Sequence, residues 1–461
     1  MTASTEPRTD KAKTLHESLS RLRMKALDTE EEFTAYYVPA SEARNAEEQD
    51  RTIKTALSIK TASEPCHILF SGHLGCGKST ELHRLGRMLK EDRFLVGIGI
   101  CEENLDMTTV KYTDLILFIL ETLLKCAKDN NISVGKKTLE SIEAYWKTVH
   151  TLVSENSNGT EIELSGAAEA RTPGLLARVF SIIVSTRSLL RTKSDTRDEY
   201  RKVIEPRFSV FIDMVNAVVD DIRSSGVRKG FCDTPPVVLL DQLEKADRDA
   251  ATELFDKHSQ DLARLRLHLV IPFPIEMCYT PSYNQIKNYY EDEWILPMIK
   301  LQTWDEQTLS YTPFPTGKEV LRSIIYKRMD ESLFADGVLD YIIDKTGGFL
   351  RHLFTVVFEA ALNAAAQDSM SIDEKDMMVA LRNLQAGISR RFPDSGRSRL
   401  QRIANGEKCY ASDEELMVFL RSGAVFEYNG KRWVDLHPLV LDWLNETSAG
   451  KKVGAQAHED G

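Results

Sequence analysis

Five short, almost wholly apolar runs lie along the chain, and helical periodicity fills most of the intervals between them. The runs span 67–70, 94–100, 237–240, 267–271 and 294–297. Runs of this length that are rich in Val, Ile, Leu and Phe are typical of strands buried on both faces, as in parallel sheets. Because the strands alternate with helices, the pattern predicts an α/β fold with a parallel sheet core.

Helical patterns occupy most of the sequence between the second and third runs. Residues 108–127 carry apolar side chains at spacings of three and four, as an amphipathic helix requires. Further along, one apolar stripe indicates a second long helix that begins near Pro206. Its members are Ile204, Phe208, Phe211, Val215, Val218 and Ile222. We therefore predict that residues 128–230, with a polar loop near 154–160, form a helical insertion in the sheet domain.

Beyond the last apolar run the chain returns to helical patterning. We predict a helical lid domain at 317–395. In residues 396–446 a helical segment precedes two apolar-aromatic runs joined by Asn429-Gly430, which is a strong hairpin signal. Helices with a hairpin favour a winged-helix-like domain. The other predicted parts are a polar lead with a short helix at 1–30, the sheet domain at 31–316 and a disordered tail at 447–461.

Composition and charge narrow the class of protein. The 461 residues are 42% hydrophobic and 28% charged, which suits a globular protein of about three domains. The seven cysteines show no C-x-x-C pair or zinc-ligand spacing, so we expect reduced thiols in a cytoplasmic protein. The N-terminus is polar and the apolar stretch 175–184 is too short to span a bilayer, so no membrane segment is expected. A net charge of −11 disfavours non-specific nucleic-acid binding.

The strongest motif follows the first apolar run. The sequence from Gly72 to Ser79 has the form G-x-x-x-x-G-K-[ST], and a helical pattern follows it. Strand, glycine loop and helix together predict a phosphate-binding loop. Main-chain N–H groups would surround an anion, Lys78 would reach the β- and γ-phosphates, and Ser79 would bind Mg²⁺. The nucleotide-binding residues predicted here are Gly72, His73, Leu74, Gly75, Cys76, Gly77, Lys78, Ser79 and Thr80.

A carboxylate ends the third apolar run and supplies a second part of such a site. Asp241 is predicted to hold Mg²⁺ together with Ser79, and Glu244 to polarise the attacking water. Two other interpretations stay open: Asp241 as a cap of the next helix, and Glu244 as a solvated carboxylate. No N-K-x-D guanine motif follows the acidic strand, which favours ATP over GTP.

Several arginines are weaker candidates. Arg351, in Gly347-Gly348-Phe349-Leu350-Arg351, opens a helix and could reach back to the γ-phosphate, or it is simply exposed. In the insertion, Arg197, Arg201 and Arg207 could include an arginine finger for a neighbouring subunit; ion pairing with Asp198, Glu199 and Glu205 is the preferred interpretation. A basic stretch, consisting of Arg382, Arg390, Arg391, Arg397, Arg399 and Arg402, is either a DNA contact or a solvated linker.

Together these motifs resemble P-loop ATPases of the AAA+/STAND kind over roughly residues 35–445. The G-x-x-R pattern ending at Arg351 is similar to the sensor-2 position of the origin-recognition branch of AAA+ proteins, which implies a nucleotide-sensing arginine. The stretch 239–244 resembles the D-x-L-[DE] motif of STAND ATPases such as NACHT proteins. The segment 427–439 resembles the winged-helix end of bacterial STAND-like ATPases that accompany defence systems. Tyr36, Tyr37 and Arg44 lie where related ATPases place an adenine pocket, with chance placement as the alternative.

Two departures from that family affect the expected activity. Gln242 stands where AAA+ proteins usually have a glutamate, and the run 269–273 offers no polar sensor at its end. Both features favour slow hydrolysis and a switch over a fast motor. The predicted function is an ATP- and Mg²⁺-binding molecular switch that controls self-assembly or a separate effector protein, plausible in bacterial antiviral defence. The alternative is a DNA-binding AAA+ initiator or loader.

Overall fold

The computed structural model describes most of the chain. The described residues are 10–44, 46, 49–60, 64–156, 174–192, 194–305, 307–308, 310–391, 396–406, 414–428 and 434–446. The predicted turn at Asn429-Gly430 and the predicted tail at 447–461 lie outside them.

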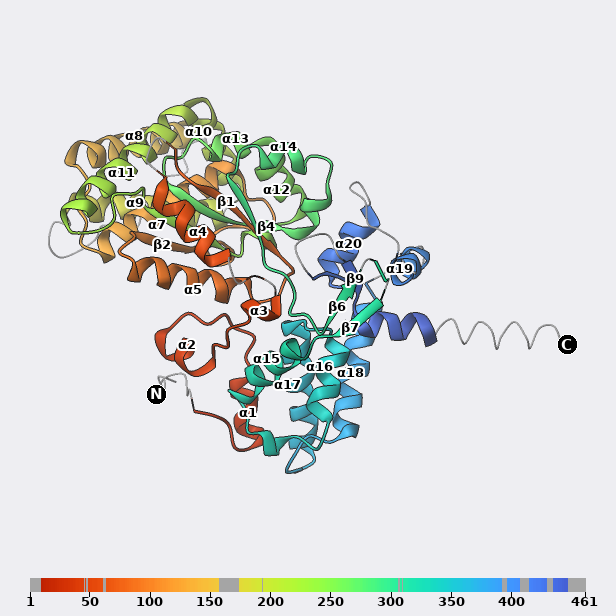
Figure 1. Cartoon of the computed structure of the whole chain (residues 1–461). Coiled ribbons are helices and arrows are strands. Elements are labelled where there is room, and N and C mark those ends of the chain that lie inside the picture. The colour runs from red at the N-terminus through yellow and green to blue at the C-terminus, as the bar shows by residue number, and fades with distance from the viewer. Residues whose placement is uncertain are drawn as a thin grey trace.

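A parallel sheet of five strands forms the centre of the upper body in Figure 1. The strand order is β2-β3-β4-β1-β5, and every neighbouring pair is parallel. The strands are β1 (His67–Gly72), β2 (Val96–Ile100), β3 (Val237–Asp241), β4 (His268–Pro274) and β5 (Asp292–Ile295). Each of the five predicted runs therefore supplies one strand, and the predicted α/β fold of the P-loop NTPase class is confirmed.

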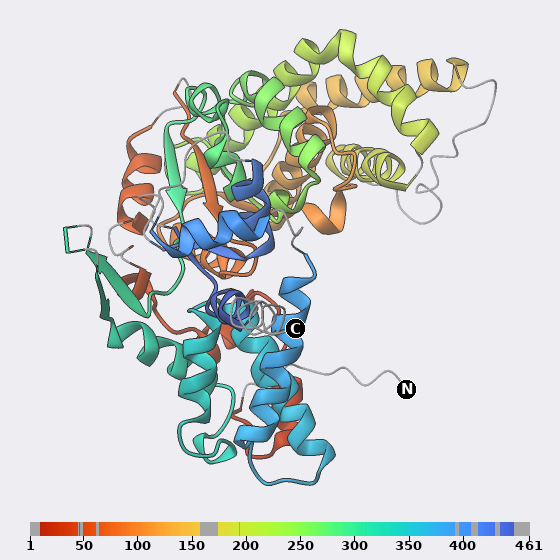
Figure 2. The same cartoon turned by 90° about the vertical axis from the view of Figure 1, so that its right-hand side faces the viewer.

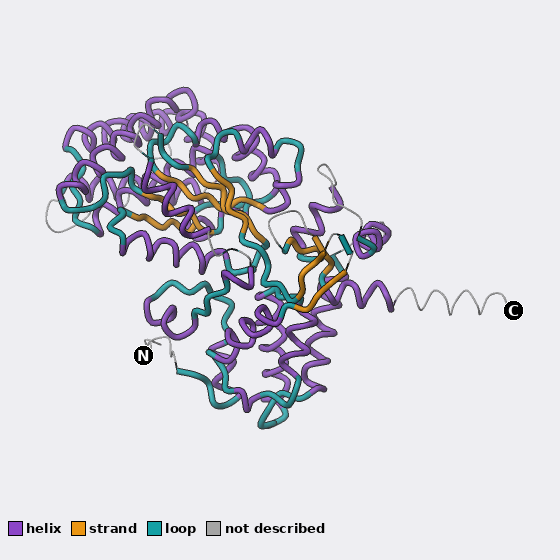
Figure 3. Tube along the Cα trace, viewed as in Figure 1, coloured by secondary structure: helices purple, strands orange, loops and turns teal. Residues whose placement is uncertain are grey.

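Helices cover both faces of this sheet, which explains why its strands are apolar on both sides (Figure 3). One face packs on α4 (Gln49–Ile59) and α5 (Lys78–Glu91) through residues such as Phe70 and Leu239. The other face packs on α7 (Tyr112–Asp129) through residues such as Leu69 and Leu240. Short elements follow the strand ends: α6 (Cys101–Asn104), η2 (Leu243–Lys245), α12 (Arg248–Thr252), η3 (Glu253–Lys257), α13 (Ser259–Leu262), η4 (Ile275–Tyr279) and α14 (Tyr283–Lys287).

The described residues between β2 and β3 form mainly helices, joined by short non-helical connections. The helices beyond α7 are α8 (Lys136–Asn156), α9 (Leu175–Thr192), α10 (Ser194–Ile204), η1 (Glu205–Arg207) and α11 (Phe208–Arg228). All six members of the predicted apolar stripe are buried. Pro206 lies in η1, which separates two α-helices, so Ile204 ends α10 and the rest of the stripe belongs to α11.

The lower body in Figure 1 is a second helical unit with its own core. It contains α15 (Pro315–Tyr326), η5 (Glu331–Leu333), α16 (Val338–Thr346), α17 (Leu350–Ala366) and α18 (Glu374–Ser389). The N-terminal α1 (Leu15–Arg21) packs on α17. From there the chain passes through residues 22–29 to α2 (Glu30–Tyr36) and α3 (Ser41–Arg44), beside the sheet domain.

The C-terminal unit has helices before a pair of strands, as predicted, and a further helix follows the strands. It comprises α19 (Gly396–Ala404), α20 (Glu414–Ser422), an antiparallel pair of β8 (Val425–Glu427) and β9 (Val434–Leu436), and helical residues 438–446. Figure 2 shows it in front of both the sheet domain and the lower helical unit. We call residues 414–446 the C-terminal module.

The sequence analysis did not predict a hairpin that precedes the lower helical unit. An exposed antiparallel hairpin, β6 (Gln302–Asp305) with β7 (Ser310–Pro313), lies between β5 and α15. Its strands are four residues long and carry no Asn-Gly turn signal. Among the helices in the described part of the chain, none is long and apolar enough to cross a membrane.

Candidate nucleotide-binding site

The predicted phosphate loop joins the carboxyl end of β1 to the start of α5, where ligands of open α/β sheets bind. Gly75 and Gly77 have φ of +97° and +106°, in the left-handed region that favours glycine. Gly77 precedes the first residue of α5, so the unpaired N–H groups of that helix face the loop. A chain that turns in this way is suited to hold an anion.

Lys78 is held inside the loop in this structure. Its side chain is 4% exposed, and Nζ donates hydrogen bonds to the carbonyl oxygens of Gly72 at 2.8 Å and His73 at 3.0 Å. Nζ also forms an ion pair with Glu244 Oε1 at 3.1 Å. Burial alone would lower the pKa of Lys78, but the negative charge of Glu244 and other nearby groups outweighs it and the pKa is raised. The lysine therefore carries its positive charge at neutral pH.

Ser79 and Asp241 are in direct contact although 162 positions separate them. Ser79 Oγ donates a hydrogen bond to Asp241 Oδ1 at 2.8 Å. The short helix η2 follows β3, and the residue at its N-cap is Gln242. Asp241 is therefore not the cap of that helix. Burial, followed by the nearby charge of Glu244, raises the pKa of Asp241.

Three buried side-chain atoms at this point have no hydrogen-bond partner among the described residues. They are Asp241 Oδ2, Glu244 Oε2 and His83 Nε2. Buried carboxylate oxygens without partners are costly, and they fit a hard cation that also takes phosphate and water ligands, as Mg²⁺ does. Ser79 and Asp241 would hold such an ion. Glu244 is buried, which excludes the interpretation as a solvated carboxylate.

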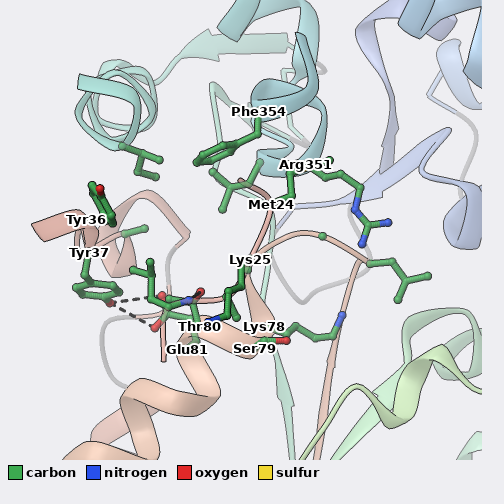
Figure 4. Close-up of a pocket in the computed structure, with 18 of the residues that line it drawn as sticks. Met24, Lys25, Tyr36, Tyr37, Lys78, Ser79, Thr80, Glu81, Arg351 and Phe354 are labelled. Atoms are coloured by element: carbon green, nitrogen blue, oxygen red, sulfur yellow. Dashed lines mark hydrogen bonds between the residues drawn. The ribbon is translucent and has the colours of Figure 1, made fainter. Parts of the chain in front are cut away.

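A cavity opens beside the loop between the sheet domain and the lower helical unit. Lys78, Ser79 and Thr80 line one side of it, and Arg351 and Phe354 from α17 line the opposite side (Figure 4). Tyr36 and Tyr37 line a third side of the cavity. Residues 23–27, which lie outside regular secondary structure, also line this cavity.

Arg44 and Arg351 contact the phosphate loop from different sides. Arg44 is buried, and its guanidinium donates to the carbonyl oxygens of Cys76 at 2.6 Å and of Pro297, so it ties the loop to the segment after β5. The main-chain N–H of Arg351 donates to the Gly75 carbonyl at 3.3 Å. The Arg351 side chain lies so close to Gly75 that a Cβ there would meet its Nε at 2.5 Å.

The C-terminal module contacts the same loop and its surroundings. The main-chain N–H of Glu427 donates to His73 Nε2 at 2.8 Å. Arg421 donates to Glu276 Oε1 and to the Ala246 carbonyl, both at 3.1 Å. These two partners follow β4 and β3, so the module touches the ends of three strands around the site.

The arginines of the insertion lie elsewhere. Arg197 and Arg201 are buried and pair with Asp106 and Asp114, respectively. The sequence analysis preferred surface pairs with Asp198, Glu199 and Glu205. Among the ion pairs of the described residues, Asp198 is the one of these three acids that pairs with an insertion arginine, Arg201, at 3.6 Å. Two buried, paired guanidinium groups are unsuited to act on another subunit. Arg207 is exposed and donates to the Val203 carbonyl.

Sequence reasoning missed the roles of Arg44, His83 and Glu427. The sequence analysis named Arg44 only as part of an adenine pocket, whereas its side chain forms a hydrogen bond with the main chain of the phosphate loop. His83 gave no signal, because a single histidine on an amphipathic helix is unremarkable. Glu427 did offer one: it is a charged residue within an apolar run, and it is buried.

Comparisons with known proteins find similarity only among solved structures. No protein-family model matches the sequence, and no curated protein matches it. The chain is similar to the ORC2 protein of Aeropyrum pernix, with 13% identity, 91% of this chain and 97% of that chain covered, and a TM-score of 0.40. It is also similar to Cdc6p of Pyrobaculum aerophilum, with 12% identity, 93% and 98% covered, and a TM-score of 0.41. A third similar structure is that of Drosophila ORC bound to DNA, with 11% identity, 92% of this chain and 80% of that chain covered, and a TM-score of 0.37. At these identities and TM-scores the likeness carries no argument about function.

Proposed function

We propose that the chain binds ATP with Mg²⁺ and hydrolyses it slowly, as a molecular switch. The observation that carries this proposal is the group of Lys78, Ser79, Asp241 and Glu244 at one point of the sheet edge. A glycine loop, an ammonium group, a hydroxyl and two carboxylates are the parts that phosphoryl transfer from a nucleotide requires. ATP is favoured because the sequence lacks the guanine-reading motif.

Each residue would have a separate role in that reaction. The loop N–H groups and Lys78 would bind the phosphates, which requires Lys78 to leave the carbonyls of Gly72 and His73. Bound Mg²⁺ would neutralise charge on the phosphates and would be held by Ser79 and Asp241. Glu244, released from Lys78, would orient the attacking water. Arg351 would contact the phosphates from the lid side of the cavity.

A titration with ATP tests the foundation of the proposal. We expect the full chain to bind a fluorescent ATP analogue with Mg²⁺, and Lys78→Ala to weaken binding at least about 100-fold, since it removes a buried charge that would meet the phosphates. Lys90→Ala is the matched control, because Lys90 is exposed at the far end of the same helix. Equal affinity of the Lys78→Ala variant and the wild type would refute the proposal.

The output of the switch would pass through the C-terminal module. It contacts the loop through His73 and the lid through Tyr428, whose hydroxyl donates to the Gly347 carbonyl at 3.0 Å. A nucleotide that changes the loop and the lid would bias this docking. We propose self-assembly or recruitment of a separate effector protein as the result, in a setting such as bacterial antiviral defence. The resemblance of the sequence 427–439 to the winged-helix end of defence-associated STAND-like ATPases supports this setting. Mass measurement with and without ATP and Mg²⁺ tests assembly.

A DNA-binding initiator is the second candidate, and the exposed arginines Arg382, Arg390 and Arg391 support it. Against it, Arg399 is buried and the Arg397 guanidinium lies over the Trp443 ring at 5.3 Å, so the basic stretch is partly internal. DNA affinity that falls steeply with salt would support this candidate. Absence of binding at low salt would eliminate it.

A further inference from the structure

His83 joins the predicted magnesium site to a distant part of the chain. It lies on the second turn of α5 and is buried. Its Nδ1 lies 3.1 Å from the carbonyl oxygen of Leu27. Because a carbonyl can only accept, Nδ1 carries the proton. In the neutral ring, Nε2 is therefore an acceptor.

Nε2 faces a carboxylate oxygen, and these two acceptors need a third group that donates hydrogen bonds to both. Nε2 is 3.6 Å from Asp241 Oδ2, and neither atom has a hydrogen-bond partner among the described residues. Two buried acceptors that face each other leave two hydrogen bonds unmade. One water molecule that donates both its protons could satisfy them. Asp241 Oδ1 is already occupied by Ser79, so Oδ2 is the oxygen left for such a water.

Leu27 is held by both of its main-chain polar groups. Besides the carbonyl contact to His83, its N–H donates to Thr80 Oγ1 at 3.2 Å. Leu27 thus docks the segment 22–29, which has no regular secondary structure, on the first two turns of α5. At its other end this segment continues from α1, which packs on α17 of the lower helical unit. The segment 22–29 therefore connects the lid with the residues that follow the phosphate loop.

We propose that His83 is a positioning residue of the magnesium site. Its Nε2 and Asp241 Oδ2 together take the hydrogen bonds of one water in the hydration shell of the ion, while its Nδ1–H anchors segment 22–29. Occupation of the metal site and docking of the segment then support each other through one imidazole ring. This inference rests on the proposed function, because it assigns a partner to the ion of that same site.

The test measures metal linkage, which is the ratio of the dissociation constants of a non-hydrolysable ATP analogue in excess chelator and in saturating Mg²⁺. Hydrogen exchange of the peptide that covers segment 22–29 is measured in parallel. Partners of this kind contribute about 10- to 100-fold to metal affinity. We expect His83→Leu to lower the ratio at least about 10-fold and to speed exchange of the segment. His16→Leu, an exposed histidine in α1, is the control and should change neither quantity.

Two further variants separate the functions of the two ring nitrogens. The amide of an asparagine lies near the position of Nδ1, and that of a glutamine near Nε2. His83→Asn should keep the slow exchange of segment 22–29 but lose the metal linkage, and His83→Gln should keep most of the metal linkage. A merely structural role would lower the melting temperature of all three variants and leave the ratio within two-fold of wild type; that result would overturn the inference. If wild type binds no nucleotide, the proposed function fails and the inference fails with it, whereas Lys78-dependent binding with unchanged ratios overturns the inference alone.

Discussion

The ring of His73 accepts a hydrogen bond at 2.8 Å from the main-chain N–H of Glu427, which lies 354 positions later. Burial, and next the nearby charge of Lys78, lower the pKa of His73 to about 3, so the ring is neutral and Nε2 can accept. The carbonyl of the same residue accepts a hydrogen bond from Lys78. His73 therefore links the ammonium group that would meet phosphate to the C-terminal module. A ligand that draws Lys78 away would therefore break one of the two hydrogen bonds of His73 that form this linkage.

The lowered pKa of His73 predicts that the free energy of unfolding depends on pH. An unfolded histidine has a pKa near 6.5, whereas His73 in the fold stays neutral down to about pH 3. Between these values the unfolded chain binds more protons, so the free energy of unfolding falls as the pH falls. From pH 7 to pH 5 this one group should cost about 2 kcal/mol. Thermal or urea unfolding at several pH values measures it.

The control is His73→Gln, which places an amide acceptor near Nε2 but cannot titrate. All other ionisable groups are common to both proteins, so only the difference between the two pH slopes is interpreted. A wild-type slope equal to that of the variant would show that His73 becomes protonated within the fold.

Glu244 and Asp241 are predicted to affect different steps. Glu244→Gln keeps the shape of the side chain but removes the charge that would orient water, so it should bind ATP and release phosphate at least about 100-fold more slowly than wild type. Asp241→Ala removes the partner of Ser79 and should weaken Mg²⁺-dependent binding. Phosphate release and nucleotide affinity are measured for each. Equal, slow release by all three proteins would mean that the chain binds nucleotide without useful turnover.

The sequence determined the sheet and the chemistry at its edge because both depend on local patterns. Five apolar runs became five strands. The loop motif and the carboxylate after 237–240 predicted one site for Ser79 and Asp241, and the two side chains are in contact in the structure. The ends of the runs did not all match the ends of the strands: the run 294–297 predicts a strand to residue 297, whereas β5 ends at Ile295, the last residue that pairs with β1.

Long-range polar contacts could not be predicted in the same way. The pairings of Arg44 with Cys76 and of Arg421 with Glu276 depend on how separate units dock, and a polar side chain carries no periodic signal of its partner. For the same reason the insertion arginines were given neighbours along their own helix, whereas burial selects Asp106 and Asp114 from another part of the chain.

Gly348 should be intolerant of any side chain. Its φ is +80°, and a Cβ there would lie 1.9 Å from the Ile299 carbonyl oxygen. Gly348→Ala combines backbone strain with overpacking against main chain, so we expect a loss of at least about 3 kcal/mol in the free energy of unfolding. Gly337 provides a matched control, with φ of +75° and open space among the described atoms where the Cβ would lie. Gly337→Ala should cost only about 1 kcal/mol, and equal losses would contradict the predicted contact.

Docking of the C-terminal module depends on Tyr428 and Arg421. Tyr428→Phe leaves the buried Gly347 carbonyl without its partner and should destabilise docking by about 1–2 kcal/mol. Arg421→Ala removes the contacts to Glu276 and Ala246 and leaves the Glu276 carboxylate, whose pKa burial raises, without its counter-charge. Both variants should release the module more readily, which limited proteolysis after α18 detects as faster cleavage at unchanged stability of the sheet domain.

If docking opposes nucleotide entry, the same variants should bind ATP more tightly than wild type, because less docking energy has to be overcome. Tighter binding with fast cleavage would support the switch, whereas fast cleavage with unchanged affinity would show that the module and the phosphate site are not coupled.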